Sequence, residues 1–218
     1  MTSSSKGNCY LCGEEFGKTA MKTHLIKRHG ALSAEQKCYL LKIEGAYDKD
    51  YWLYMDVPVT ASLSSVDAFL RKIWLECCGH LSAFSGPGHC EIGKARKLEA
   101  FHVGDQLLHE YDFGSTTETM ITIVGETGRE KQKTLCRLLA RNTPPSFQCA
   151  VCGAPATLLC TECRYDSDNP FLCDSCAENH EHGDMLLPVV NSPRMGECGY
   201  TGELDVFTFD PNALSKSL

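Results

Sequence analysis

Cysteine and histidine pairs are concentrated in the last third of the 218-residue chain, and their spacing is that of metal ligands. Three Cys-x2-Cys pairs and one His-x-His pair follow one another: Cys149 and Cys152, Cys160 and Cys163, Cys173 and Cys176, His180 and His182. Thiolate sulfur and imidazole nitrogen are ligands that Zn2+ prefers, and a structural zinc site is tetrahedral. Eight ligands therefore predict two closed zinc sites, in which no coordination position stays open for a substrate.

The spacing of these pairs resembles that of cross-brace modules such as the B-box and ZZ-type fingers. In those modules the first and third pairs share one ion, and the second pair shares the other ion with the last ligands. The resemblance implies one site at Cys149, Cys152, Cys173 and Cys176, and another at Cys160, Cys163, His180 and His182. A sequential pairing stays open, and Cys198 is a spare ligand in a glycine-rich turn. Because this segment has few large aliphatic side chains, we expect each zinc to contribute about 10–16 kcal/mol to its folding.

A second ligand set lies near the N-terminus, with two cysteines, a spacer of eleven residues and two histidines: Cys9, Cys12, His24 and His29. It resembles a two-Cys two-His zinc finger, although the usual spacer is about twelve residues. Phe16 and Met21 stand where such a finger places its small core. The sequence thus predicts a third structural zinc ion in a finger of residues 1–33.

Basic side chains give this finger a positive charge: Lys18, Lys22, Lys27 and Arg28. They could contact the phosphates of a nucleic acid, or they could form a solvated helix face. The positions that would meet base edges carry none of the Arg, Asn or Gln side chains that read bases: Gly17, Thr19, Ala20 and Thr23. Nucleic-acid binding by the finger is therefore an alternative function rather than the first one.

The charge of the chain is unevenly distributed. Residues 1–30 carry five Lys/Arg against two Asp/Glu, residues 31–148 carry thirteen against fifteen, and residues 149–218 carry three against eleven. An acidic C-terminal region repels phosphate and attracts neutral or basic surfaces. We therefore expect this region to bind a protein partner.

Composition also bears on the location of the chain. Hydrophobic residues make up 43% of it, but no apolar run approaches the eighteen residues of a membrane span, so we expect no membrane partner. The N-terminus has no apolar stretch of the kind found in secretory signals. In a reducing cytosol, paired cysteines are metal ligands rather than disulfides, so we predict a cytoplasmic protein.

Regular hydrophobic patterns lie between residues 35 and 143 and predict an α+β domain. Its main helix is expected at Leu63–Cys77, with Ser64 and Asp67 as a capping box. Six strands are expected, the first two as a hairpin: Cys38–Ile43, Tyr51–Val57, Leu81–Phe84, Leu107–Phe113, Met120–Val124 and Leu135–Ala140. Residues 125–134 have the composition of a charged turn. The predicted fold is a sheet of about six strands with the helix on one face, flanked by two small zinc-stabilised modules.

Consecutive prolines at 144 and 145 separate this domain from a double-zinc module at residues 147–200, which precedes a tail at 201–218. Over residues 36–202 the chain resembles the plasmid ORF-3-like family, whose members are often labelled transposon-passenger or resolvase-like proteins. The segments that carry the resemblance are Cys38–Ile43, Trp52–Pro58, His80–Phe84, Tyr111–Gly114, Thr119–Ile123, Leu138–Asn142 and Asn191–Gly202. The resemblance implies an α+β fold and a role near mobile elements. The chain lacks the Ser/Arg-rich segment that a resolvase would need.

An enzyme is a further alternative. It would need a pocket in the central domain where His102, His109 and Asp112 converge. The neighbours His89 and Cys90 are a weaker candidate, because adjacency in sequence does not supply the geometry of an activated thiol. We therefore predict three structural zinc ions, no catalysis, and an adaptor or binding role, as an accessory of mobile-element or nucleic-acid transactions.

Overall fold

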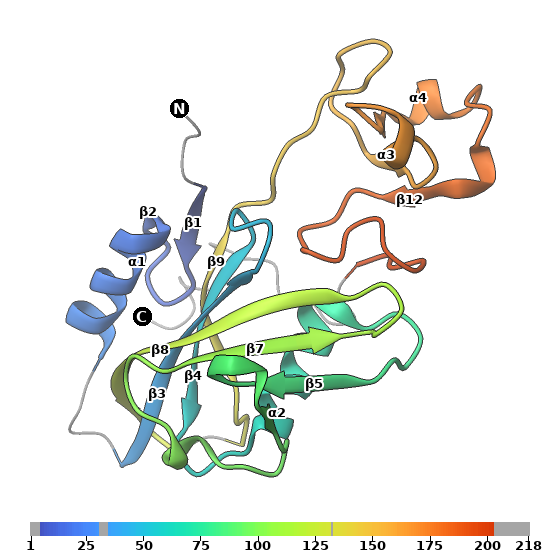
Figure 1. Ribbon diagram of the computed structural model, residues 1–218. Coiled ribbons are helices and arrows are strands. Elements are labelled where there is room, and N and C mark those ends of the chain that lie inside the picture. The colour runs from blue at the N-terminus through green and yellow to red at the C-terminus, as the bar shows by residue number, and fades with distance from the viewer. Residues whose placement is uncertain (1–4, 31–34, 132, 203–218) are drawn as a thin grey trace.

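The computed structural model describes residues 5–30, 35–131 and 133–202, so most of the predicted tail lies outside the described residues. Strands dominate a mixed fold, which contains one large antiparallel sheet and a second, small sheet (Figure 1). The α+β class is confirmed at this level. The large sheet has nine strands rather than about six.

The strands of the large sheet are β1 Lys6–Cys9, β2 Glu15–Gly17, β3 Gln36–Gly45, β4 Trp52–Pro58, β5 Ser82–Ser85, β6 Glu91–Ile92, β7 Gln106–Tyr111, β8 Thr117–Arg129 and β9 Arg137–Asn142. They lie in the order β2-β1-β9-β4-β3-β8-β7-β5-β6. The small sheet contains β10 Leu158–Cys160, β11 Phe171–Leu172 and β12 Leu186–Pro188, in the order β11-β10-β12. The α-helices are α1 Lys18–His24, α2 Leu63–Leu70, α3 Cys163–Asp166 and α4 Asp174–Ala177. Wide π-helical turns continue α1 as η1 (Leu25–His29) and α2 as η2 (Arg71–Leu75).

Each of the six predicted strands overlaps an observed one, and β3 and β4 form the predicted hairpin. The charged turn predicted at residues 125–134 is wrong in its first part, because β8 continues to Arg129 and pairs with β3 beyond a register shift at Leu40 and Leu41. Arg129 can occupy a buried strand position because its guanidinium donates to Asp56 at 2.6 Å, and both side chains are buried. An ion pair across the sheet thus makes a polar sequence compatible with a strand.

Strand β4 is buried at every position, because both faces of the sheet are covered. On one face Leu53, Met55 and Val57 pack in the main core with α2 and η2. On the other face Trp52 and Tyr54 belong to a second hydrophobic cluster. The sequence predicted the helix that covers the first face, but it predicted no cover for the second face.

Helix α2 begins at the predicted residue, but the capping box is wrong. Its N-cap is Ser62, which makes no side-chain capping hydrogen bond, and the loop at residues 94–96 supplies carbonyl acceptors for the first N–H groups. Asp67 is instead turned into the protein, where it accepts hydrogen bonds from Ser82 and Lys94. The helical segment ends at Leu75, two residues before the predicted Cys77.

The N-terminal segment, predicted as a zinc finger, supplies the cover of the second face. Met21 of α1 and Leu25 of η1 are buried against β4 and β9, and β1 pairs with β9 as an additional strand of the large sheet (Figure 1). Gly7 allows this pairing, since a Cβ there would lie 2.2 Å from the Arg141 carbonyl oxygen and 2.7 Å from the Trp52 ring. The finger is therefore joined to the central sheet by hydrogen bonds and by a hydrophobic cluster.

The segment after β12 returns to the central domain (Figure 1). Ser192 donates to the Trp74 carbonyl at 2.7 Å, and the fully buried Arg194 donates to Asp112 at 2.7 Å. Tyr200 is also buried. We call residues 191–200 the return segment. Across the described residues, every helix is too short or too polar to cross a membrane.

Replacing Gly7 by Ala should destabilise the protein by about 1–3 kcal/mol, because the new methyl group would overlap backbone that cannot move independently of the sheet. Denaturant unfolding of the purified chain measures this change. The control is Gly93→Ala, since a Cβ at Gly93 meets nothing within 4 Å. Equal stability of the two variants would show that β1 is not held against β9.

Candidate metal centres

Four groups of Cys and His side chains converge in the described part of the chain, and each could hold a metal ion. Within each group one ligand atom from every residue lies within 4.8 Å of the others. Tetrahedral zinc with ordinary bond lengths requires about 3.8 Å between two sulfurs and about 3.5 Å between sulfur and nitrogen. All fourteen cysteines are free thiols, so no disulfide competes for these sulfurs.

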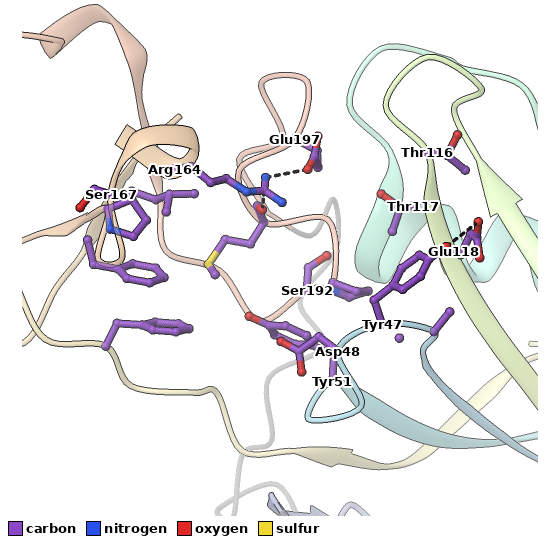
Figure 2. Close-up of a pocket in the computed structure, with 18 of the residues that line it drawn as sticks. Tyr47, Asp48, Tyr51, Thr116, Thr117, Glu118, Arg164, Ser167, Ser192 and Glu197 are labelled. Atoms are coloured by element: carbon purple, nitrogen blue, oxygen red, sulfur yellow. Dashed lines mark hydrogen bonds and ion pairs between the residues drawn. The ribbon is translucent and has the colours of Figure 1, made fainter. Parts of the chain in front are cut away.

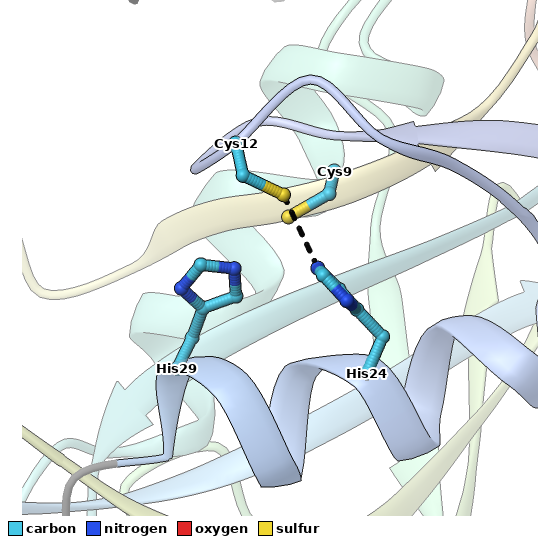
Figure 3. A group of neighbouring side chains, drawn as sticks. All are labelled: Cys9, Cys12, His24 and His29. Atoms are coloured by element: carbon cyan, nitrogen blue, oxygen red, sulfur yellow. Dashed lines mark hydrogen bonds between the residues drawn. The ribbon is translucent and has the colours of Figure 1, made fainter.

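The finger cluster consists of Cys9, Cys12, His24 and His29. The strand β1 and the turn after it carry the cysteines, while α1 and η1 carry the histidines, whose rings point toward the sulfurs (Figure 3). Cys12 Sγ lies 3.3 Å from His24 Nε2. His29 Nε2 is buried and has no hydrogen-bond partner, as expected of an atom whose partner is a metal ion.

One further contact suits a metal at the finger cluster. His24 Nδ1 lies 3.4 Å from a Glu14 carboxylate oxygen, the kind of outer contact that orients a ligating imidazole. Burial raises the pKa of the Cys9 thiol to about 11. A bound dication would reverse this effect by stabilising the thiolate.

The four-cysteine cluster contains Cys149, Cys152, Cys173 and Cys176. Cys152 Sγ and Cys173 Sγ are 3.6 Å apart. Backbone N–H groups of Cys152 and Cys173 lower the pKa of the Cys149 thiol to about 6, whereas hydrogen bonding with the Cys173 sulfur raises that of Cys176 to about 12. The Cys149 thiolate is thus readily formed, whereas a cation beside Cys176 would be needed to stabilise its thiolate.

The mixed cluster contains Cys160, Cys163, His180 and His182. Cys163 Sγ lies 3.4 Å from His180 Nε2 and 3.6 Å from His182 Nδ1. His182 Nε2 lies 3.2 Å from Glu181, which could orient the ring. The structure thus groups the first cysteine pair with the third, and the second pair with the histidines. The cross-brace resemblance implied this grouping.

The segment predicted as a double-zinc module, residues 147–200, has a small hydrophobic core. Its own hydrophobic cluster has only Cys149, Leu172 and Ala177 as buried members, and two of its four partly buried members are the ligands Cys173 and Cys176. Such a cluster is too small to offset the conformational entropy of the chain that it orders. Metal ligation at the four-cysteine and mixed clusters would add the folding free energy that the small core does not supply.

A fourth cluster was not predicted from the sequence. It joins Cys77, Cys78 and His80, which follow η2, with the distant Cys198 of the return segment. The sequence signal was Cys77-Cys78-Gly79-His80, but its remaining ligand lies 118 residues from His80. Only the folded chain brings them together.

The basic residues of the finger occupy different environments. Lys18 pairs with Glu44 and donates to the Lys49 carbonyl, so its ammonium group is engaged within the protein. Lys22 is half-buried, while Lys27 and Arg28 are exposed.

The residues proposed for an enzyme pocket do not converge. His109 is fully buried and bonded to Asp67 at 2.9 Å. Asp112 binds Arg194, and His102 is exposed beside Asp105. Burial lowers the pKa of His109, which keeps its imidazole neutral within the core. The three side chains therefore form no common site.

Comparison with known proteins adds little to this picture. No family model and no curated protein matches the chain. Among solved structures, a protein of unknown function, MM3350 from Methanosarcina mazei Go1, aligns with a TM-score of 0.40 and 16% sequence identity. The alignment covers 47% of this chain and 68% of that one. Membership of the plasmid ORF-3-like family therefore stays a prediction.

The double variant Cys173→Ser/Cys176→Ser should lose the ion of the four-cysteine cluster, and also that of the mixed cluster if the two sites fold together. Elemental analysis gives the metal content, and hydrogen exchange should rise in residues 147–190 while β3 and β4 stay protected. Cys90→Ser is the control, since Cys90 is exposed and belongs to no cluster among the described residues. Unchanged metal content in the double variant would contradict metal binding at these cysteines.

Proposed function

We propose that this chain is a non-catalytic, zinc-stabilised adaptor that binds a basic segment of a protein partner. The binding site is the groove between the double-zinc module and the central sheet (Figure 2). Three structural zinc ions, at the finger, four-cysteine and mixed clusters, form part of this proposal. So do a cytoplasmic location and, from the family resemblance, a partner connected with mobile elements.

The groove has a volume of about 450 Å³, enough for one or two side chains of a peptide. The turn after β3 and the start of β8 line one wall, and α3 with the strand β11 lines the other (Figure 2). Residues of the return segment also line it. Its aromatic side chains include that of Tyr47, a residue that is 85% exposed.

The charge of the lining supports a basic occupant. Four acidic side chains face one basic side chain, Arg164, among the lining residues: Asp48, Glu118, Asp168 and Glu197. Arg164 pairs with Glu197 at 2.6 Å, which leaves three carboxylates without a compensating cation in the lining. Lysine or arginine side chains would find opposite charge here, and nucleic-acid phosphate would be repelled.

The single observation that carries the proposal is a pair of stacked rings next to a metal cluster. Phe147 and Phe171 lie in the groove with ring centroids 3.9 Å apart and an angle of 12° between the ring planes. Each phenylalanine stands two residues before a cysteine of the four-cysteine cluster, Cys149 or Cys173. A metal that joins these cysteines would therefore hold the two rings together as a surface for a guanidinium or ammonium group.

Binding of a fluorescent peptide rich in Lys and Arg tests this proposal. We expect Glu118→Gln/Asp168→Asn to weaken binding about tenfold, equivalent to about 1.4 kcal/mol, and more strongly at low salt than at high salt. Phe147→Ala should also weaken it, through loss of the ring pair. Anisotropy titration measures the affinity.

Two controls accompany this titration. Glu91→Gln removes an exposed carboxylate outside the groove lining and should leave the affinity unchanged. An acidic peptide of equal length should not bind. Equal affinity of the groove variant and the Glu91 variant for the basic peptide would contradict the proposal.

The second candidate function is nucleic-acid binding by the finger. The observation that favours it is the exposure of Lys27 and Arg28, which line a shallow depression on the side of α1 and η1 where Phe16 and Ala20 lie. Their number is small, and Lys18 is engaged with Glu44. We therefore rank this function below peptide binding.

Charge reversal tests the finger directly. If it contacts phosphate, Lys22→Glu/Lys27→Glu/Arg28→Glu should abolish a salt-dependent gel shift of mixed-sequence DNA or RNA. Lys37→Glu changes an exposed lysine outside the finger and is the control. Absence of a shift with the unmodified protein at low salt would exclude this function.

A further inference from the structure

The fourth cluster lies at the junction between the helical segment of the central domain and the return segment. Cys78 Sγ is 3.5 Å from Cys77 Sγ, 3.8 Å from Cys198 Sγ and 2.9 Å from His80 Nε2. His80 Nε2 is 3.2 Å from Cys198 Sγ. The two sulfur separations and the 3.2 Å contact lie within about 0.3 Å of the edges of a zinc tetrahedron, about 3.8 Å and about 3.5 Å, while the 2.9 Å contact is shorter than such an edge.

The chain is bent so that these side chains meet. Gly79 has φ +79°, a left-handed backbone that brings His80 back toward the two cysteines before it. Cys198 itself has φ +45°, which is uncommon for a residue with a Cβ. A return turn that places a cysteine in this conformation, with its sulfur among three other ligands, indicates that the position of the sulfur matters.

The surroundings suit a metal with three thiolate ligands. Three thiolates and one dication leave a net charge of −1, and the buried guanidinium of Arg194 donates to Cys77 Sγ at 3.4 Å. Such outer contacts orient metal ligands and offset their charge. Asp112 lies 3.4 Å from His80 Nε2, but its Oδ2 also accepts from Arg194 at 2.7 Å, so this carboxylate is already paired.

The cysteines of the cluster are not disulfide-bonded. A disulfide requires about 2.05 Å between the sulfurs, whereas Cys78 Sγ lies 3.5 Å from Cys77 Sγ and 3.8 Å from Cys198 Sγ. Cys38, Cys90 and Cys136 are the remaining cysteines that belong to none of the four clusters. Eleven of the fourteen thiols thus lie in groups with the geometry of metal ligands.

We propose that Cys77, Cys78, His80 and Cys198 bind a fourth structural zinc ion, which fastens the return segment to the end of η2. Three thiolates and one imidazole form one of the usual closed ligand sets of structural zinc. The site joins parts of the chain that belong to two of the predicted units, the central domain and the double-zinc module. This inference does not depend on the binding of a basic peptide.

The fourth zinc would also fix the position of the double-zinc module. The module contacts the return segment at two points. Arg164 pairs with Glu197. Leu159 packs against Gly196, where an added Cβ would lie 2.3 Å from the Leu159 side chain. Glu197 and Gly196 directly precede Cys198. Anchoring Cys198 therefore restrains the side of the module that faces the sheet.

Metal analysis of the full-length protein tests the proposal. After purification with zinc present and removal of loosely bound metal, elemental and native mass spectrometry should find four zinc ions per chain. Cys198→Ser should bind three, and Cys78→Ser should give the same result. Cys90→Ser, the control, should bind four, because Cys90 is as exposed as Cys198 but lies outside every cluster.

Folding of the variants is checked independently. Ser192 and Arg194 hold the return segment through contacts that contain no zinc, so Cys198→Ser should keep the protection of β3 and β4 in hydrogen exchange. Exchange should rise only in residues 191–200 and in the module. Cobalt substitution adds a spectroscopic readout. The sulfur-to-cobalt charge-transfer band should be weaker in Cys198→Ser, by the intensity that one site with three thiolate ligands contributes.

Two outcomes would overturn the proposal. One is a zinc content that is the same in the unmodified protein, Cys198→Ser and Cys78→Ser. The other is a reductant-sensitive crosslink that involves Cys198 in the native protein, with a mass two hydrogens below that of the thiol form. Neither result bears on peptide binding in the groove, which the anisotropy titration tests separately.

Discussion

The burial of strand β4 on both faces is the constraint on which the arrangement of the large domain depends. A strand without any exposed residue needs a cover on each side of the sheet. The helix α2 and its continuation η2 cover one side, and α1 with η1 covers the other. The finger therefore uses its hydrophobic face to complete the core, and only its outer side remains available for ligands.

Packing of the finger against the sheet limits the surface of its helix that could contact a nucleic acid. A free two-Cys two-His finger presents its helix to the major groove of DNA, but here Met21 and Leu25 are committed to the sheet, and Lys18 to Glu44. Metal binding at Cys9 and Cys12 would then stabilise an additional edge of the sheet as well as the finger itself. A metal at this ligand pattern would thus also serve the stability of the central domain.

The double-zinc module depends on a different interaction. Its hydrophobic cluster is small, so a cation held by the four-cysteine and mixed clusters would add folding free energy that this core does not supply. The stacked Phe147 and Phe171 each stand two residues before a cysteine of the four-cysteine cluster, so a metal there would also order the groove. Arg194 joins the return segment to the central domain, because its guanidinium contacts Asp112 and Cys77.

The sequence by itself determined the features that depend on residues close together in the chain. Ligand pairs such as Cys149 and Cys152 are separated by two residues, which is a local geometry, and the hairpin of β3 and β4 follows from alternation around a short turn. The start of α2 was found from its apolar spacing, although Asp67 proved to serve a buried polar network rather than a cap.

Only the tertiary structure decided which distant residues meet. The pairing of β1 with β9, the burial of Arg129 against Asp56, and the approach of Cys198 to His80 all join segments far apart in sequence. A pattern of residue types cannot encode these contacts, because their free energy comes from covering a shared surface or neutralising a shared charge. For this reason three of the four clusters could be predicted from spacing, whereas the fourth required the fold.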